Sequence, residues 1–189
     1  MTQHVIRPVR ADEWEKVKEL RLAALSDPVA PLAFLETVAQ AAEKPDGFWQ
    51  DRARGAAEGN GVRQFVAEAP DGRWDGTVTV FLEEIGATDF LEQTVERNQG
   101  HVVGVFVRPE QRGTGITDAL FEAALEWAWS REEPALECVR LFVHEDNERA
   151  GAFYRRFGFE PSGLVIPKPG DPTSKELEYV FARPQGQPG

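Results

Sequence analysis

A short glycine-rich turn between a predicted strand and a predicted helix has the residue types of an anion-binding site. The apolar run of residues 102–107 indicates a strand that is covered on both faces. Pro109 ends this strand because proline cannot donate to the sheet ladder. The turn reads Gln-Arg-Gly-Thr-Gly over residues 111–115, and a helical pattern begins directly after it. Since glycines let backbone N–H groups approach an anion and a helix N-terminus adds positive potential, the turn predicts a site for phosphate groups.

The residues of this turn differ from those of other phosphate-binding motifs. It lacks the Lys-Ser/Thr pair of a P-loop and the Gly-x-Gly-x-x-Gly of a dinucleotide fold. Residues 107–116 instead resemble the acetyl-CoA signature of the GNAT superfamily of N-acetyltransferases, Gln/Arg-x-x-Gly-x-Gly/Ala after a Val-x-Pro strand end. The signature falls on Arg112, Gly115 and Thr117, where Thr117 departs from the usual Gly or Ala. The alternative interpretation is an ordinary turn between a strand and a helix.

A second motif lies in residues 147–159. Ala150, Phe153, Tyr154 and Phe157 recur at the spacing of one helix face, so a capped, core-facing helix would explain most of them. The stretch also resembles the other GNAT signature, Asn-x-x-Ala-x-x-Phe-Tyr-x-x-x-Gly-Phe. It matches at all six named positions, which are Asn147, Ala150, Phe153, Tyr154, Gly158 and Phe159. Two signatures in the right order and spacing support membership of this superfamily.

The resemblance implies an α/β GNAT fold with a central mixed, mostly antiparallel sheet and helices on both faces. It also implies that the parallel strands at 102–107 and 137–143 splay apart. We expect one domain over residues 1–189, with a disordered tail at 183–189. Proline, glycine and apolar spacing predict turns at 45–47 and 70–73, and loops at 55–61, 86–100 and 167–175. They predict helices at 12–25, within 29–60, at 116–131 and at 147–157, and further strands at 5–9, 63–69, 76–84, 164–166 and 176–181.

The resemblance further implies transfer of the acetyl group of acetyl-CoA to a primary amine of a small molecule, protein or peptide, within a ternary complex. Tyr154 matches the acid that protonates the departing thiolate, and backbone amides near Phe106 and Val107 match the donors to the developing oxyanion. Asn147 matches a pantetheine contact, although an asparagine is also a favoured helix N-cap. The cofactor-binding residues implied in this way are Val105, Phe106, Val107, Arg112, Gly113, Thr114, Gly115, Ile116, Thr117, Asp118, Asn147 and Tyr154.

The reaction also needs a proton acceptor, because an alkylammonium with a pKa of about 10.4 is almost never neutral at pH 7. The Glu that some family members carry on the fifth strand is replaced here by Phe142. His101 stands where other members carry an acid, and an imidazole accepts a proton near neutral pH without strong tuning. The alternative for His101 is a solvated residue at the start of a strand. Glu83 and Glu84 are further candidates for the base, as is His144.

Composition excludes several other classes of protein. The 189 residues include 32 acidic and 21 basic side chains, and the net charge of −11 argues against nucleic-acid or membrane binding. The charge is compatible with a cationic acceptor. The single Cys138 allows no intrachain disulfide, and with only three histidines we expect no metal site. No long apolar run or signal-peptide pattern occurs, so a cytoplasmic location is expected.

Other functions of the same motifs remain open at this stage, as does a homodimer. A noncatalytic acyl-CoA sensor would keep the fold and the glycine turn, and a nucleotide-binding protein would use the turn for a different phosphate ligand. Cys138 is a poor candidate for a nucleophile because it lies in an apolar strand with no base in its pattern.

Overall fold

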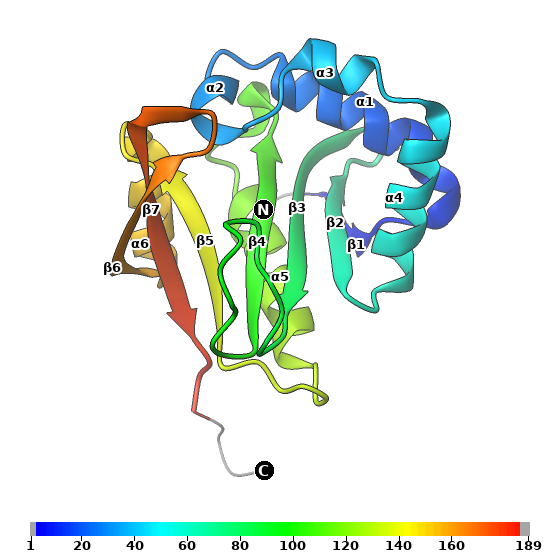
Figure 1. Cartoon of the computed structure of the whole chain (residues 1–189). Helices are drawn as coiled ribbons and strands as arrows, with labels where there is room; N and C mark the ends of the chain where they lie inside the picture. The colour runs from blue at the N-terminus through cyan, green and yellow to red at the C-terminus, as the bar shows by residue number, and fades with distance from the viewer. Residues whose placement is uncertain (1–2, 186–189) are drawn as a thin grey trace. The chain divides into compact units, whose positions relative to one another are not determined.

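The computed structural model describes residues 3–185, which contain both helices and strands (Figure 1). The α-helices are α1 (Trp14–Leu25), α2 (Ala30–Ala33), α3 (Val38–Ala42), α4 (Asp46–Glu58), α5 (Ile116–Trp129) and α6 (Glu148–Phe157), with short 3-10 helices η1 (Ala11–Glu13) and η2 (Pro109–Gln111). The strands are β1 (Val5–Pro8), β2 (Val62–Glu68), β3 (Trp74–Glu83), β4 (Gln99–Val107), β5 (Cys138–His144), β6 (Glu160–Lys168) and β7 (Asp171–Ala182).

The strands form one mixed sheet in the order β1-β2-β3-β4-β5-β7-β6. The pairs β1–β2, β2–β3, β5–β7 and β6–β7 are antiparallel, whereas β4 and β5 run parallel. The β4–β5 pairing extends only from Gln99 with Cys138 to His101 with Arg140, although both strands continue beyond these residues. The predicted mixed sheet with a parallel pair that separates is therefore confirmed.

The chain divides into two compact units, and each unit is built from two separate stretches of sequence. The first unit takes residues 1–81 and 103–124, and the second takes residues 82–102 and 125–189. The expectation of a single domain stays a prediction.

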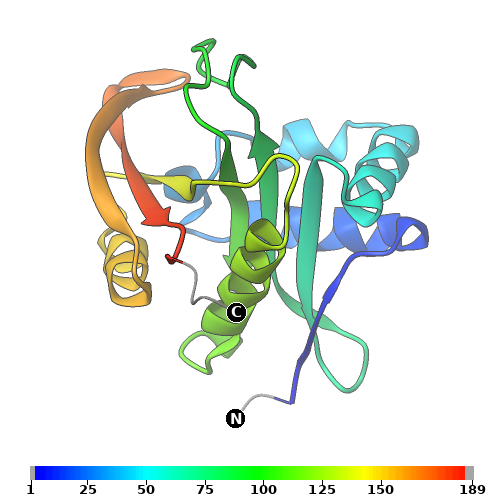
Figure 2. The same cartoon turned by 90° about the horizontal axis from the view of Figure 1, so that it is seen from below.

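The first unit has an apolar core between its helices and β2 and β3. In this unit α4 packs against α1 and β2, while α4 and the first turns of α5 lie on opposite faces of β2 and β3 (Figure 2). Gly76 on β3 allows the approach of α5, since a Cβ there would lie 3.1 Å from Leu120 and 3.2 Å from Ile116. The buried cluster consists of Val9, Val17, Leu20, Ala24, Leu25, Ala41, Trp49, Ala53, Val66, Trp74 and Phe106.

The second unit contains β5, β7 and β6 together with α6 and an aromatic cluster. Tyr154 on α6 lies 5.9 Å from Phe159 and 6.1 Å from Tyr179 between ring centroids. Phe181 on β7 lies 5.3 Å from Phe159 and extends the cluster along the same strand as Tyr179. These contacts place the α6 face that the sequence predicts to be buried against β7.

Three expectations from the sequence are wrong in detail. The predicted turn at 45–47 contains the start of α4, and α4 continues through the predicted loop at 55–61 until Gly59 ends it in the left-handed region at φ 67°. Most of the predicted loop at 167–175 belongs to β6 and β7, where Pro167 pairs with Lys175. In all three cases pairing or packing with distant residues outweighs the local proline and glycine signals.

The predicted disorder over residues 183–189 is wrong for Arg183. The backbone N–H of Arg183 donates to the carbonyl of Glu137 at 2.9 Å, and its guanidinium donates to the carbonyls of Leu136 and Trp129. Arg183 is thus held at the end of β7, and residues 186–189 lie outside the described residues. Within residues 3–185, no helix combines the length and the apolar character that a membrane span requires.

Candidate active site

The glycine turn has the conformation that an anion site requires. Gly113 and Gly115 have φ values of 77° and 92°, in the left-handed region that glycine adopts without strain. A Cβ at either position would meet no atom within 4 Å, so the backbone of the turn borders open space. α5 begins directly afterwards at Ile116, and the N–H groups of its first turn have no acceptor within the helix. The turn therefore fits the pyrophosphate of CoA.

The remaining side chains of the turn hold its shape. The hydroxyl of Thr114 donates to the carbonyl of Gln111 at 2.6 Å, and Ile116 is buried. Thr117, which departs from the family signature, is half-buried in the first turn of α5 beside Asp118, the acidic residue of that turn.

Arg112 does not extend its guanidinium into open space. Its Nε donates to the carbonyl of Val107 at 3.1 Å, and an Nη donates to the carboxylate of Asp27 at 2.8 Å. Asp27 is itself buried, follows α1, and accepts a hydrogen bond from the backbone N–H of Val29. Arg112 thus ties both the end of β4 and the segment after α1 to the glycine turn.

The carboxyl-terminal half of β4 carries the backbone donors implied for the oxyanion. Gly104 adopts φ 64°, which interrupts the regular alternation of the strand. After this irregularity Val105 is half-buried, and Phe106 and Val107 are buried.

On α6, Asn147 and Tyr154 have clear structural roles. Asn147 is the N-cap, and its Oδ1 accepts a hydrogen bond from the N–H of Ala150 at 3.3 Å. Tyr154 is 7 % exposed, and burial raises the pKa of its hydroxyl. The phenol therefore keeps its proton at neutral pH, as a general acid must.

A buried group of charges in the second unit, which we call the Arg140 cluster, consists of Glu83, Asp89, Arg140 and Glu178. The Arg140 guanidinium donates to both carboxylate oxygens of Glu83 at 2.8 and 3.0 Å, and to Asp89 at 3.0 Å and Glu178 at 3.2 Å. Burial acts to raise the pKa of Glu83, but His101 and Arg140 outweigh it and lower the pKa to about 2. A carboxylate held in this way is a poor proton acceptor at neutral pH.

His101 lies beside this cluster and is only 7 % exposed. Its Nδ1 is 3.5 Å from a carboxylate oxygen of Glu83. Its ring centroid lies 5.2 Å from that of Phe90 and 5.7 Å from that of Phe142. The interpretation of His101 as a solvated strand-end residue is therefore wrong, because aromatic rings and a carboxylate enclose it.

The other candidates for chemistry are less suitable. Glu84 is exposed, whereas Glu83 is held by Arg140. His144 is buried and its Nδ1 accepts the backbone N–H of Asp146 at 3.0 Å. Cys138 is buried, and burial raises the pKa of its thiol, which disfavours a nucleophilic thiolate. No group of three or more His, Cys, Asp or Glu side chains within residues 3–185 is arranged to hold a metal ion.

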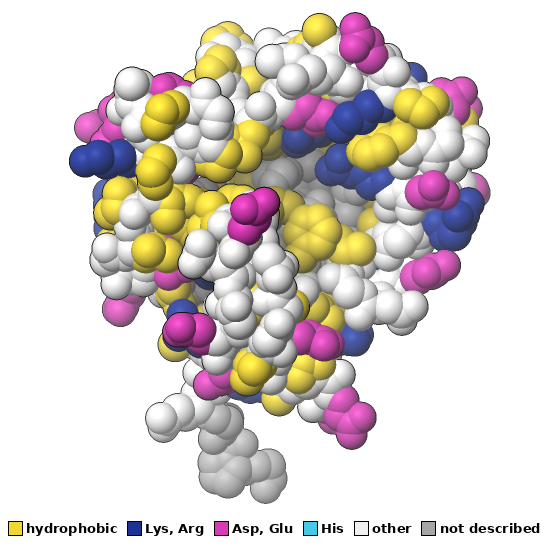
Figure 3. All heavy atoms as spheres, in the orientation of Figure 1, with side chains coloured by type: hydrophobic (Ala, Val, Ile, Leu, Met, Phe, Trp, Pro, Cys, Tyr) yellow, Lys and Arg dark blue, Asp and Glu magenta, His cyan; other side chains and the backbone are white. Residues whose placement is uncertain are grey.

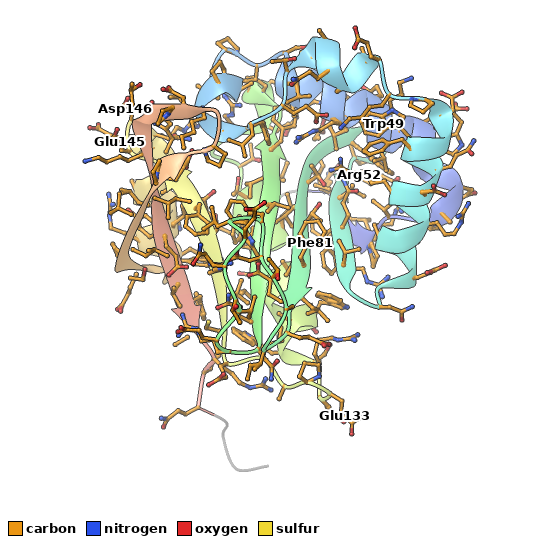
Figure 4. All side chains as sticks on the ribbon, in the orientation of Figure 1. Trp49, Arg52, Phe81, Glu133, Glu145 and Asp146 are labelled. Atoms are coloured by element: carbon orange, nitrogen blue, oxygen red, sulfur yellow. The ribbon has the colours of Figure 1, made fainter. Side chains whose placement is uncertain are left out.

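One pocket in the first unit was not anticipated from the sequence. It is lined by Val17, Leu20, Arg21, Ala24, Arg52, Gln64, Thr77, Thr79 and Gly104. Arg52 reaches it from α4 and points toward β3 (Figure 4). Its position on the helix face of Trp49, Ala53 and Ala56 would have marked it, had residues 46–58 been recognised as one helix.

Comparison with known proteins identifies the family. The sequence model of the Acetyltransferase (GNAT) family matches residues 37–159, and the chain belongs to this family. An uncharacterised N-acetyltransferase of Methanocaldococcus jannaschii is 34 % identical over 77 residues, which cover 41 % of this chain and 33 % of that protein. The chain thus spans about a third of the length of that relative.

Two solved structures share the fold at low identity. NAA60 of Arabidopsis thaliana in complex with acetyl-CoA has a TM-score of 0.68 at 16 % identity, covering 96 % of this chain and 100 % of that chain. The PaiA N-acetyltransferase of Thermoplasma acidophilum in complex with coenzyme A has a TM-score of 0.67 at 16 % identity, with the same coverage. With the family match, they show that this chain has the GNAT fold.

Proposed function

We propose that this protein transfers the acetyl group of acetyl-CoA to a primary amine by direct attack in a ternary complex. The observation that carries the proposal is the open glycine turn at the N-terminus of α5, with Gly113 and Gly115 in left-handed conformations. When bound, acetyl-CoA supplies an activated acetyl thioester. The chain must then bind the pyrophosphate, stabilise the oxyanion, and move two protons.

Backbone and side-chain groups share the proposed binding roles. Backbone N–H groups from Gly113 to Asp118 bind the pyrophosphate. Arg112 positions this turn through its hydrogen bonds to Asp27 and Val107, in place of the direct phosphate contact that the resemblance implies. Backbone N–H groups near Phe106 and Val107 donate to the oxyanion. The amide of Asn147 contacts pantetheine while its Oδ1 caps α6.

The proton transfers are assigned to two side chains. Tyr154 gives its proton to the departing sulfur, and the raised pKa of the phenol keeps that proton in place until it is needed. His101 accepts a proton from the amine through water. Glu83 remains a carboxylate close to Nδ1 and stabilises the imidazolium that forms. Glu84 is the alternative base, because it is exposed and can exchange protons with water.

The proposal is tested with the intact chain by two measurements. Calorimetry measures acetyl-CoA binding, and release of free CoA thiol is measured over a panel of primary amines. We expect acetyl-CoA to bind and at least one amine to accelerate CoA release. Binding without acceleration by any amine would favour the noncatalytic acyl-CoA sensor, and stabilisation by ATP but not by CoA would favour a nucleotide-binding protein. The cytoplasmic location and a homodimer remain proposals.

A further inference from the structure

The pocket beside α4 contains a positive charge without a partner. The Arg52 side chain is partly buried, and its guanidinium lies 5.8 Å from the ring centroid of Trp49. Within residues 3–185, no hydrogen bond or ion pair joins it to another residue. Partly buried charges are normally paired, because removing them from water costs free energy.

The charges nearest to Arg52 do not neutralise it. Arg21 lines the same pocket, and its Nε and Nη2 donate to the Glu36 carboxylate at 3.1 and 3.0 Å. Glu36 also accepts a hydrogen bond from Lys44, so two cations share this one carboxylate. Burial and the positive charge of Arg21 lower the pKa of Arg52 and outweigh the opposite effect of the Glu36 carboxylate. The pocket therefore has an excess of positive charge in a protein whose net charge is −11.

The floor of the pocket is polar and belongs to β2 and β3. Thr77 and Thr79 are neighbours on one face of β3, and Gln64 on β2 pairs with Thr79. The Gln64 amide donates to the Thr77 hydroxyl at 3.0 Å, which in turn donates to the carbonyl of Phe65 at 2.8 Å. Lys and Arg side chains gather over α1 and α4 where these helices face β3 (Figure 3). A guanidinium above hydroxyl and amide groups is suited to a planar carboxylate, which can accept two parallel hydrogen bonds.

One lining residue of the pocket lies on the strand that carries the proposed oxyanion donors, and another lies two residues from an exposed aromatic ring. Gly104 lines the pocket and precedes Phe106 by two residues on β4. Phe81 follows Thr79 by two residues on β3, on the same face, and 42 % of its surface is exposed (Figure 4). A small molecule that extends from the pocket along this face of β3 would meet a cation at one end and an apolar ring at the other.

We infer that this pocket binds the acyl acceptor, and that the acceptor is a small amine that also carries a carboxylate, which pairs with Arg52. The inference rests on the proposed function for the acetyl transfer but not for the binding of the carboxylate. An ammonium group on the same molecule agrees with the acidic composition of the chain. The apolar part of such an acceptor rests against Phe81.

The test compares amines that differ only in the carboxylate. The pairs are phenylalanine with phenethylamine, tyrosine with tyramine, and lysine with cadaverine. Acetylation is followed by CoA release. Binding is measured separately by calorimetry with the acetylated forms of each pair and without acetyl-CoA. In at least one pair we expect the carboxylate-bearing member to bind about tenfold more tightly or better.

Variants then assign this preference to Arg52. In Arg52→Gln the carboxylate-bearing member should lose about 10- to 100-fold in affinity while the plain amine is unaffected, and Arg52→Lys should restore part of the loss. Arg54→Gln is the matched control, because Arg54 lies on the same helix, is exposed and pairs with Asp51. Acetyl-CoA affinity should be the same in all four proteins.

Several outcomes would overturn the inference. One is equal or tighter binding of the plain amine in every pair, and another is a carboxylate preference that survives in Arg52→Gln. A loss of acetyl-CoA affinity in Arg52→Gln would assign Arg52 to the cofactor instead. Failure of the proposed function has a different signature, since the carboxylate would then still be bound through Arg52 although no amine accelerated CoA release.

Discussion

The glycine turn and the Arg140 cluster place functional groups in opposite ways. The turn uses backbone N–H groups from one short stretch, residues 113–118, and two of its glycines border open space. The cluster uses buried side chains from β3, β5, β7 and the loop after β3, with one guanidinium facing three carboxylates. Local sequence specifies the first arrangement, whereas long-range packing assembles the second. Changes to the turn should therefore act on cofactor binding, and changes near the cluster on proton transfer and stability.

The largest effect is expected for Gly115→Asp. The new carboxylate would lie where the turn is proposed to bind pyrophosphate, and the side chain would strain a backbone at φ 92°. Like-charge juxtaposition costs several kcal/mol, so calorimetry should show acetyl-CoA affinity reduced by more than about a hundredfold.

The matched control for this substitution is Gly170→Asp. Gly170 has a similar φ of 83° and also borders open space, but it lies between β6 and β7. This control should lose comparable stability and keep acetyl-CoA binding. Equal affinity in both variants would contradict the assignment of the pyrophosphate to the turn.

Tyr154→Phe removes a single hydroxyl from the aromatic cluster. If Tyr154 protonates the departing sulfur, kcat should fall by about 10²- to 10⁴-fold while acetyl-CoA affinity is retained. Tyr179→Phe is a suitable control, since the Tyr179 hydroxyl accepts a hydrogen bond from Arg155 at 2.8 Å and has no role in the proposed chemistry. A fall in kcat of less than about threefold would mean that solvent supplies the proton and that Tyr154 serves packing.

His101→Gln tests the part of the second unit where His101 and the Arg140 cluster meet. With His101 as proton acceptor, the substitution should lower kcat/KM about tenfold or more, because the attacking amine loses the group that takes its proton. Acetyl-CoA affinity should not change. An unchanged kcat/KM would leave His101 with a structural role and make Glu84→Gln the next variant to measure.

The smallest effect concerns the stability of the Arg140 cluster in acid. The pKa of Glu83 is lowered to about 2 in the folded chain, below the ordinary value of 4.5. A depressed pKa stabilises the fold above the unfolded-state value, and that contribution is lost as the pH falls through the folded-state value. The free energy of unfolding should therefore decline between pH 4.5 and about 2.

Chemical unfolding of the native chain and of Glu83→Gln across this range measures the contribution. The variant should be less stable near neutral pH, because Arg140 loses a carboxylate partner, and its stability should depend less steeply on pH in this window. Parallel curves for the two proteins would mean that Glu83 is not depressed by its neighbours.

The sequence by itself determined the strand, glycine turn and helix at residues 102–129, and the capped helix α6. These elements follow from local chemistry, since proline ends a strand, glycine adopts positive φ, and Asn147 caps a helix whose apolar residues share one face. Because both family signatures lie in such elements, the family could be predicted as well.

Only the tertiary structure decided which charges are paired. Arg140 looks like any strand arginine in the sequence, yet it meets Glu83, Asp89 and Glu178, which are 38 to 57 residues away. Arg52 lies in a segment whose proline and glycines suggest turns, and packing of α4 on α1 and β2 makes it a helix that carries a guanidinium into a pocket. The pairing of a charge depends on which side chains approach it in space, and spacing along the chain carries information only about neighbours on the same element.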